Sequence, residues 1–335
     1  MSRAKKDSAV YRPDLGQAVM EFMEDPAAGM GFIGTEIMPI FRTAVNSGSY
    51  PVIPIEALLK LANVDRAPRG GYGRDDYEYE RGQFATLEKG FEELLDDSER
   101  AMFDQESPGM ADFVAARRAW MKIMRGQERR IAAKIFNATN FSANSVSVCW
   151  DVAASAAPID DVKTGVAAFR KQCGMLPSGL IISYTTFLAL QVADQIVDQL
   201  KYTFPGIDVT NLNAQQLARV FGVPRVWVAG AVYDSAGKGQ AASISDIWDD
   251  EYAALVRVSN GQDLMEPCVG RTFLWTADSP QSPIVEEYRD EEHRSDVYRV
   301  RHHVAEEFIA SKDDTGTVVS NVAAACVYLM ANIDT

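Results

Sequence analysis

The chain has 335 residues, 47% of them hydrophobic, and a formal net charge of −14 at pH 7. A chain of this length and composition can form one large domain or two ordinary ones around a sizeable core. The negative charge argues against a stand-alone DNA-binding protein, because neutralising phosphate groups requires a basic surface.

The spacing of the cysteines and the absence of long apolar segments bear on the compartment. No segment approaches the roughly eighteen consecutive apolar residues of a membrane-spanning helix, and none follows the basic start as a secretory signal would. The cysteines lie far apart in the sequence, without a CxxC pair, which favours reduced thiols in a cytoplasmic assembly compartment. They are Cys149, Cys173, Cys268 and Cys326.

The first thirty residues are predicted to form an arm with little core of its own, or a frayed terminus. Within them, Asp14–Glu24 has the apolar spacing of a short amphipathic helix, which Asp25-Pro26 should end. Gly29–Gly34 matches the GxGxxG pattern of dinucleotide-binding loops. No strand precedes it and Pro39 follows it, so we expect flexible turns there and no cofactor site.

A charged, glycine-rich segment follows at residues 64–90. It holds five glycines, four arginines and six acidic residues, too few apolar side chains to build a core. A loop of this length is either disordered or placed against another surface. Tyr77 and Tyr79 alternate with charges, Arg81-Gly82 is turn-like, and Phe84–Leu87 follow, which weakly predicts a two-strand hairpin. Such a hairpin is marginal alone and should lean on a neighbouring subunit.

After an acidic bridge at residues 91–107, the sequence predicts one long helix over Gly109–Asn137. Pro108 lies just ahead of it, with Ser107 as a plausible cap. At 1.5 Å per residue the helix would span about 40 Å. Apolar residues recur at helical spacing along one face, which predicts that this face is buried. They are Phe113, Trp120, Met124, Ile131 and Ile135.

The other face of this helix carries a basic stripe, with Glu128 as the only acidic residue nearby. Like charges at helical spacing repel each other, so the stripe is either a solvated face or the partner of an acidic surface. The matching acidic side chains lie in the glycine-rich loop, and we expect the contact to join two subunits. The predicted assembly interface consists of Arg118, Lys122, Arg125 and Arg129 from the stripe and Asp75, Asp76, Glu78 and Glu80 from the loop.

From Trp150 onwards, predicted helices and strands alternate, a pattern that would equally suit an α/β enzyme domain at residues 150–263. That block contains no histidine. The predicted helices are Ile159–Cys173, Phe187–Leu200 and Leu212–Phe221, the last closed by Gly222 and Pro224. The predicted strands are Leu180–Ile182, Arg225–Tyr233, Thr272–Trp275, Val297–Val304 and Thr317–Met330.

No motif predicts a catalytic, cofactor or metal site. Gly237-Lys238 lacks the remaining residues of a phosphate-binding loop and is interpreted as a hairpin turn. His303 with Glu306 and Glu307 could in principle hold a metal ion. Adjacent histidines on a strand face opposite ways, however, so His302 and His303 cannot both bind one ion. The third histidine, His293, has no supporting context.

In their order, these segments resemble the major capsid proteins of tailed double-stranded DNA phages, whose architecture we call the Hong Kong-type capsid fold. No single motif is diagnostic, and the ordered series over nearly the whole chain carries the resemblance. Besides the loop and the long helix, it runs through Gly31–Pro39, Ser47–Tyr50, Val52–Pro54, Trp150-Asp151, Pro158–Asp160, Gly174–Pro177, Gln216–Val223, and Trp248 after Ser243–Ser245.

The resemblance implies an α+β fold with an N-terminal arm, an extended loop, a peripheral domain with a long spine helix, and an axial domain. The implied boundaries are 1–30 for the arm, 31–63 for the first peripheral segment, 64–90 for the extended loop, 91–149 for the peripheral domain with spine helix 109–137, 150–265 for the axial domain, and 266–335 for the returning peripheral strands.

The resemblance also implies a structural role without enzymatic activity. The chain would assemble with itself into hexamers and pentamers of an icosahedral phage head. This head would enclose double-stranded DNA without sequence-specific binding, and no membrane would be involved. A separate scaffolding protein and a portal are implied partners, with assembly in the host cytoplasm and a final place in the virion. The alternatives are an encapsulin-like compartment shell and a soluble α/β enzyme with its site in residues 150–263.

Overall fold

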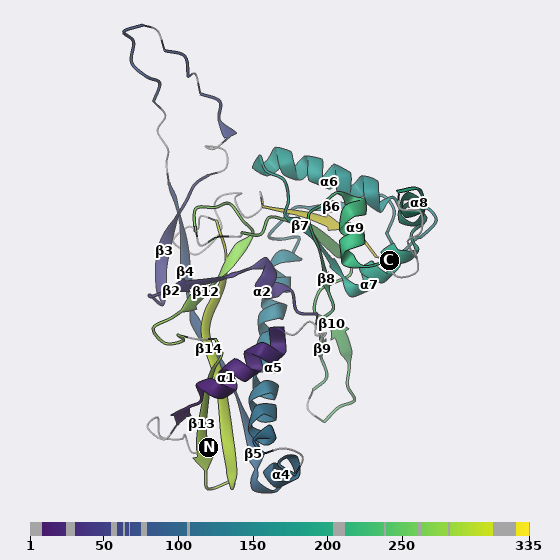
Figure 1. The fold of residues 1–335 in the computed structure, drawn as a ribbon. Coiled ribbons are helices and arrows are strands. Elements are labelled where there is room, and N and C mark those ends of the chain that lie inside the picture. Colours follow the sequence, from purple (N-terminus) through teal and green to yellow (C-terminus); the bar gives the residue numbers. More distant parts are fainter. Residues whose placement is uncertain are drawn as a thin grey trace.

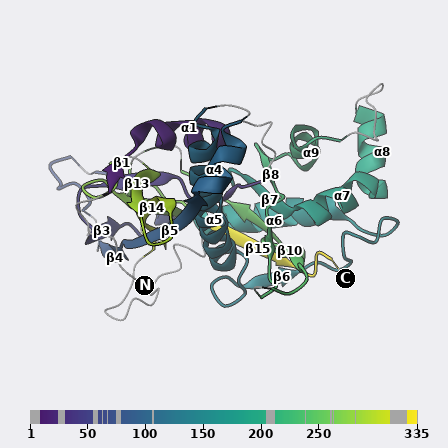
Figure 2. The ribbon, with the colours of Figure 1, turned by 90° about the horizontal axis from the view of Figure 1, so that it is seen from below.

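A computed structural model gives the fold of the chain. It describes residues 9–24, 31–54, 59–62, 64–66, 68–74, 79–105, 108–203, 212–237, 239–259, 261, 263–280, 282–310 and 326–334. Two β-sheets lie on either side of one long helix, α5 (Met110–Ile135), which confirms the predicted α+β class (Figure 1). Viewed from below, α1 and the strands β5, β13 and β14 lie to one side of α5, and the helices α6 to α9 lie to the other (Figure 2).

The first sheet is six-stranded and mostly antiparallel. One face packs against α5 because alternate residues of β14, among them Tyr298 and Val300, point toward the helix and are buried. All ten residues of β5 pair with β14, which makes β5 an edge of the sheet. The strands are β1 (Val10–Tyr11), β13 (Ile284–Asp290), β14 (Ser295–Phe308), β12 (Gly270–Trp275), β2 (Ile40–Thr43) and β5 (Leu87–Asp96).

The second sheet has five strands in the order β6, β15, β11, β7, β8. Strand β7 is buried at every residue, as expected for the predicted buried strand at Leu180–Ile182, and β11 is buried except at Tyr252. The strands are β6 (Ala143–Ser145), β15 (Val327–Ala331), β11 (Tyr252–Val256), β7 (Gly179–Ser183) and β8 (Val226–Ala229). The helices beside it are α6 (Pro158–Cys173), α7 (Tyr184–Val192), α8 (Asp194–Thr203) and α9 (Ala214–Phe221).

Smaller elements complete the fold. Two two-stranded ribbons form separate small sheets, and short helices precede β2 and α5. These elements are the ribbon of β3 (Ser47–Val52) with β4 (Glu80–Ala85), the ribbon of β9 (Val232–Asp234) with β10 (Ile244–Asp246), and the helices α1 (Pro13–Glu24), α2 (Gly34–Ile37) and α4 (Asp97–Phe103).

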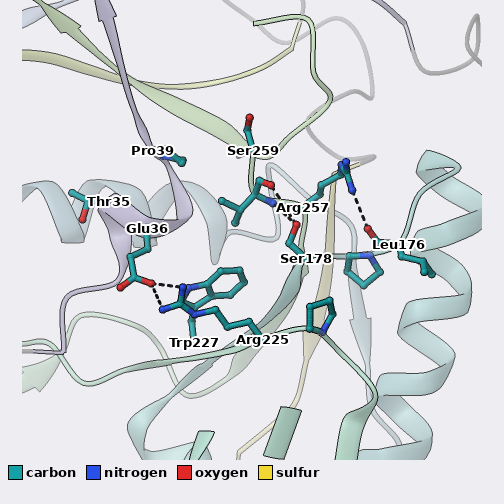
Figure 3. A pocket seen from close by; sticks show the side chains of 12 residues that line it. Thr35, Glu36, Pro39, Leu176, Ser178, Arg225, Trp227, Arg257 and Ser259 are labelled. Carbon is teal, nitrogen blue, oxygen red and sulfur yellow. Dashed lines mark hydrogen bonds and ion pairs between the residues drawn. The ribbon is translucent and has the colours of Figure 1, made fainter. Parts of the chain in front are cut away.

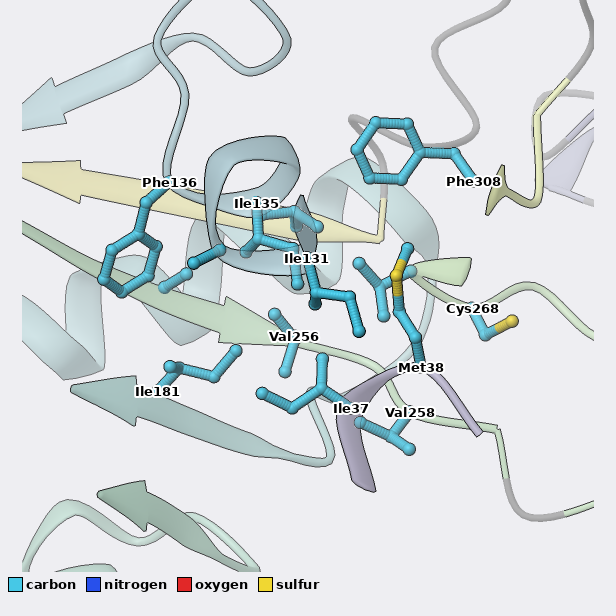
Figure 4. Close-up of a cluster of buried hydrophobic side chains, with 14 of the residues drawn as sticks. Ile37, Met38, Ile131, Ile135, Phe136, Ile181, Val256, Val258, Cys268 and Phe308 are labelled. Atoms are coloured by element: carbon cyan, nitrogen blue, oxygen red, sulfur yellow. The ribbon is translucent and has the colours of Figure 1, made fainter. Parts of the chain in front are cut away.

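The core joins the two sheets through α5. Ile131 and Ile135 of the helix meet Ile181 and Val256 of the second sheet and Met38 after α2 (Figure 4). All five side chains are buried, so this junction is stabilised by the hydrophobic effect. The two sheets therefore share one core at this end of α5.

Local predictions hold where capping and periodicity decide the structure. The long helix spans Met110–Ile135 and buries Trp120, Met124, Ile131 and Ile135 on one face, whereas Phe113 is only partly buried. Its N-cap is Gly109 and not the predicted Ser107, which lies outside the described residues. The helix α9 begins at Asn213, which forms a capping box with Gln216, and ends at Gly222, whose φ of 68° lies in the left-handed region.

The hairpin predicted around Arg81-Gly82 is wrong. These residues lie inside β4, which pairs with β3 from the other side of the glycine-rich segment. Gly82 is required there by a neighbouring ring, because an added Cβ would lie 2.3 Å from ring carbons of Tyr50. Tertiary contact, and not turn formation, therefore explains this glycine.

Two further elements are interrupted. The helix predicted over Phe187–Leu200 is two helices, since the backbone at Ala193 is extended and α8 begins at Asp194. The strand predicted over Arg225–Tyr233 is broken after Ala229, where the Gly230 N–H donates to the carbonyl of Gly31.

Gly31 belongs to the GxGxxG pattern, and its place in the fold explains why glycine is needed there. Its φ is +65°, and an added Cβ would lie 2.7 Å from the backbone of Gly230. The residue therefore permits two chain segments to approach closely.

The two ends of the chain also depart from the predictions. Leu15 and Val19 of α1 are buried against α5 and the first sheet, so residues 9–24 pack on their own chain, contrary to an arm without a core. At the other end, β15 pairs with β11 in the second sheet and does not join the returning strands β12 to β14. Residues 317–325 of the strand predicted at Thr317–Met330 lie outside the described residues.

Candidate assembly surfaces

The described parts of the segment between β3 and β4 project far from the body of the molecule (Figure 1). Its described apolar side chains face solvent: Leu61 is 98% exposed, Val64 87% and Tyr72 75%. Arg66 stacks on Tyr72 and donates to the carbonyl of Gly70, so these contacts are local. These exposed side chains are available for contact with another chain.

The root of this projection is anchored in the core. Phe84 of β4 stacks on Phe273 of β12 with ring centroids 4.3 Å apart, and Tyr50 of β3 stacks on the same ring. The Tyr50 hydroxyl donates to the carbonyl of Phe308 at 2.7 Å, and burial raises the pKa of Tyr50 well above its ordinary value. The projection therefore begins from a fixed base.

Part of the basic stripe is neutralised by the chain itself. Glu93 of β5 lies 3.0 Å from both Arg118 and Lys122, with its two carboxylate oxygens divided between them. Glu93 belongs to the acidic bridge at residues 91–107, for which the sequence predicted no contact. Exposed pairs of this kind contribute only about 0–1 kcal/mol each. Arg118 keeps 59% of its side chain exposed, which leaves it accessible to a further partner.

The C-terminal half of the stripe, Arg125 and Arg129, has different contacts. Arg129 lies over the ring of Tyr233 at 4.9 Å. In the parts of the chain that the structure describes, Arg125 has no ion pair or hydrogen bond. Of the predicted acidic partners, Glu80 begins β4 opposite Val52, and Asp75, Asp76 and Glu78 lie outside the described residues. The contact between stripe and loop stays a prediction.

Glu128, expected beside the basic stripe, is instead buried at the junction of three segments. Its carboxylate accepts the N–H of Ile33 at 3.0 Å, the N–H of Gly34 at 2.8 Å and the indole N–H of Trp248 at 2.7 Å. Burial raises the pKa of Glu128. Glu128 lies four residues after Met124 and three before Ile131, which places it on the apolar face of the helix. That spacing could have predicted that Glu128 is buried.

The three side chains considered as metal ligands, His303, Glu306 and Glu307, have other partners. Glu306 accepts two hydrogen bonds from Arg130 at 3.0 and 2.7 Å, and Glu307 lies 3.3 Å from Lys134. The His303 ring bonds to the hydroxyl of Thr86. Among the residues described, no group of three or more potential metal ligands is found.

A pocket of about 700 Å³ lies between α2, β8 and the segment after β11 (Figure 3). The Glu36 carboxylate accepts the Trp227 indole N–H at 3.0 Å and pairs with Arg225. Ser178 shares hydrogen bonds with the backbone of Val258. Several of its polar groups thus bind one another, the backbone or the Glu266 carboxylate. Its lining contains no histidine or cysteine that could form a nucleophile–base pair.

Comparison with known proteins identifies the fold. No family model matches the sequence, and no curated protein does. Among solved structures, a phage-related protein from Bordetella bronchiseptica RB50 has a TM-score of 0.70 at 20% identity, covering 97% of this chain and 98% of that one. The chain has the Hong Kong-type capsid fold.

Two further structures with this fold are more distant in sequence. The virus-like particle from Pyrococcus furiosus has a TM-score of 0.54 at 11% identity, over 95% of this chain and 98% of that one. The capsid of a native GTA particle has a TM-score of 0.53 at 14% identity, over 90% of each chain. Within the Hong Kong-type capsid fold, α5 is the spine helix and the projecting segment is the extended loop. The domain boundaries stay a prediction.

Proposed function

We propose that this chain is a major capsid protein, a structural subunit that assembles into the hexamers and pentamers of an icosahedral phage head. The observation that carries the proposal is the fold, which matches a phage-related protein over nearly the full length of both chains. The exposed apolar side chains of the projecting loop support it, since they offer a surface for a second subunit. The role is structural and not enzymatic.

The mechanism is the combination of many modest contacts. Each subunit offers a loop, a basic stripe on the spine helix and a rigid body, and several weak contacts together make a closed shell stable. The loop is held at its root by Tyr50 and Phe84, so a neighbour that binds it also fixes the orientation of the body. The acidic residues 75, 76, 78 and 80 of a neighbour would bind the stripe.

The proposal extends to partners and location. The head encloses double-stranded DNA without sequence-specific contacts, and the net charge of −14 keeps the wall from adhering to the packed polyanion. A separate scaffolding protein and a portal take part in assembly in the host cytoplasm, and the finished protein belongs to the virion. No helix in the described part of the chain is long and apolar enough to span a membrane.

Shortening the extended loop tests the proposal. Val52 and Glu80 are a directly opposed pair, so residues 53–79 can be replaced by an Asn-Gly turn that keeps both strands. We expect the full chain to form rings or shells in gel filtration and negative-stain microscopy. The shortened chain should melt cooperatively but not close shells.

Two outcomes would contradict the proposal. If the full chain remains a monomer or dimer even when its scaffolding protein is present, the result argues against a capsid subunit. Normal shells from the shortened chain argue against the role of the loop. The contents of purified particles distinguish a phage head from an encapsulin-like compartment. Packaged DNA indicates a phage head, and protein cargo indicates an encapsulin-like compartment.

A further inference from the structure

His302 lies in β14 beneath the spine helix and is only 1% exposed. Its ring meets the indole of Trp120 edge-on, with centroids 5.3 Å apart and an interplanar angle of 84°. The Nε2 atom is buried and has no hydrogen-bond partner among the described residues. A buried polar atom without a partner is uncommon and costs stability, so its presence at this contact requires an explanation.

The groups around His302 disfavour a second proton on the ring. Lys89 lies directly opposite it on β5, and Arg130 faces it from the spine helix. On β14 itself, Glu306 is the nearby acid and His303 the other titratable group. The Glu306 carboxylate is already bound by Arg130 through two hydrogen bonds. Burial is the main cause that lowers the pKa of His302 to about 4. Glu306 opposes this shift, while Arg130, Lys89 and His303 add to it.

We propose that His302 is an acid-sensitive lock between the spine helix and β14. The neutral ring packs against Trp120 and holds the helix on the strand. A protonated ring must be hydrated, and water reaches Nε2 only when this contact opens. Acid therefore loosens the spine helix from the first sheet before the whole subunit unfolds.

The pH window follows from the shift. An accessible histidine has a pKa of about 6.5, and the pKa of His302 in the folded chain is lower. The contact between His302 and Trp120 is therefore most stable above about pH 6.5, and it loses stability as the pH falls toward the folded pKa. Within that window, a fall of one pH unit favours the open form by up to about tenfold, and by less near either pKa. The lock belongs to the single chain and does not depend on the proposed assembly.

Hydrogen exchange followed by mass spectrometry tests the lock on the intact protein. Exchange is measured at pH 6.5, 6.0 and 5.0 on peptides from residues 115–131 and 295–308 and corrected for the intrinsic rate. We expect the opening constant of both segments to rise roughly 15-fold from pH 6.5 to pH 5.0, because the exposed ring is already half protonated at pH 6.5. The His302→Phe variant keeps a ring against Trp120 and should lose most of this dependence.

Two more variants make the outcome unambiguous. His293→Gln removes a histidine that is 63% exposed and should keep the wild-type dependence. His302→Leu is smaller and serves if the Phe ring does not fit. The same acid dependence in His302→Phe or His302→Leu as in the wild type would overturn the proposal, as would a wild type whose two segments do not respond to pH. These results are independent of whether the protein forms shells.

Discussion

Replacing Glu128 tests how one buried carboxylate holds three segments together. In Glu128→Ala, the N–H groups of Ile33 and Gly34 and the indole N–H of Trp248 lose their acceptor. In Glu128→Gln, the amide keeps one oxygen as an acceptor. The amide NH₂ group takes the place of the second oxygen and must face an N–H donor. The two variants therefore separate the loss of the side chain from the loss of its charge.

The expected magnitudes follow from this geometry. Each buried donor left without an acceptor costs about 1–3 kcal/mol. Three such donors would give a larger sum, but burial raises the pKa of Glu128, which means that the ionised carboxylate already loses part of this stabilisation to desolvation. We therefore expect Glu128→Ala to lower the free energy of unfolding by about 3–5 kcal/mol and Glu128→Gln by about 1–3 kcal/mol.

Urea unfolding of the unassembled subunit, followed by far-UV circular dichroism, measures both losses. Glu291→Gln is the matched control, because its side chain is 86% exposed and its removal should leave the midpoint unchanged. A loss below about 1 kcal/mol in Glu128→Ala would refute the reasoning, since three unsatisfied buried donors cannot be that inexpensive.

Three further predictions concern the core, the loop root and the stripe. Trp120→Ala should lower the free energy of unfolding by about 3–5 kcal/mol because its ring is buried under the spine helix, and an unchanged melting temperature would mean that the ring is not packed there. Gly82→Ala should displace Tyr50 from its stack and cost about 1–3 kcal/mol, whereas Gly71→Ala, with no atom within 4 Å of the added Cβ, should melt like the wild type. The double reversal Arg125→Glu with Arg129→Glu should block assembly at low salt and recover as salt rises, while the same change at Lys163 and Lys171 on α6 should assemble normally. Normal shells from the stripe variant at low salt would leave the stripe a solvated face.

Local pattern was enough to predict the elements that depend on near neighbours in sequence. The spine helix follows from apolar residues at helical spacing, and the end of α9 follows from Gly222. Its N-cap Asn213 lies one residue inside the predicted start at Leu212. The buried strand β7 follows from a short apolar run. In each case the interactions that fix the element join residues a few positions apart, so the sequence contains them directly.

The candidate surfaces depended on contacts that no local pattern encodes. Periodicity indicated that one face of the spine helix is buried but could not indicate that Glu128 on that face binds the N–H groups of Ile33 and Gly34. Glu93 reaches the stripe only because β5 pairs with β14 across about two hundred residues of sequence. Such pairings form because they bury apolar surface from distant segments together, and the choice among possible partners is made by the three-dimensional packing of the whole chain.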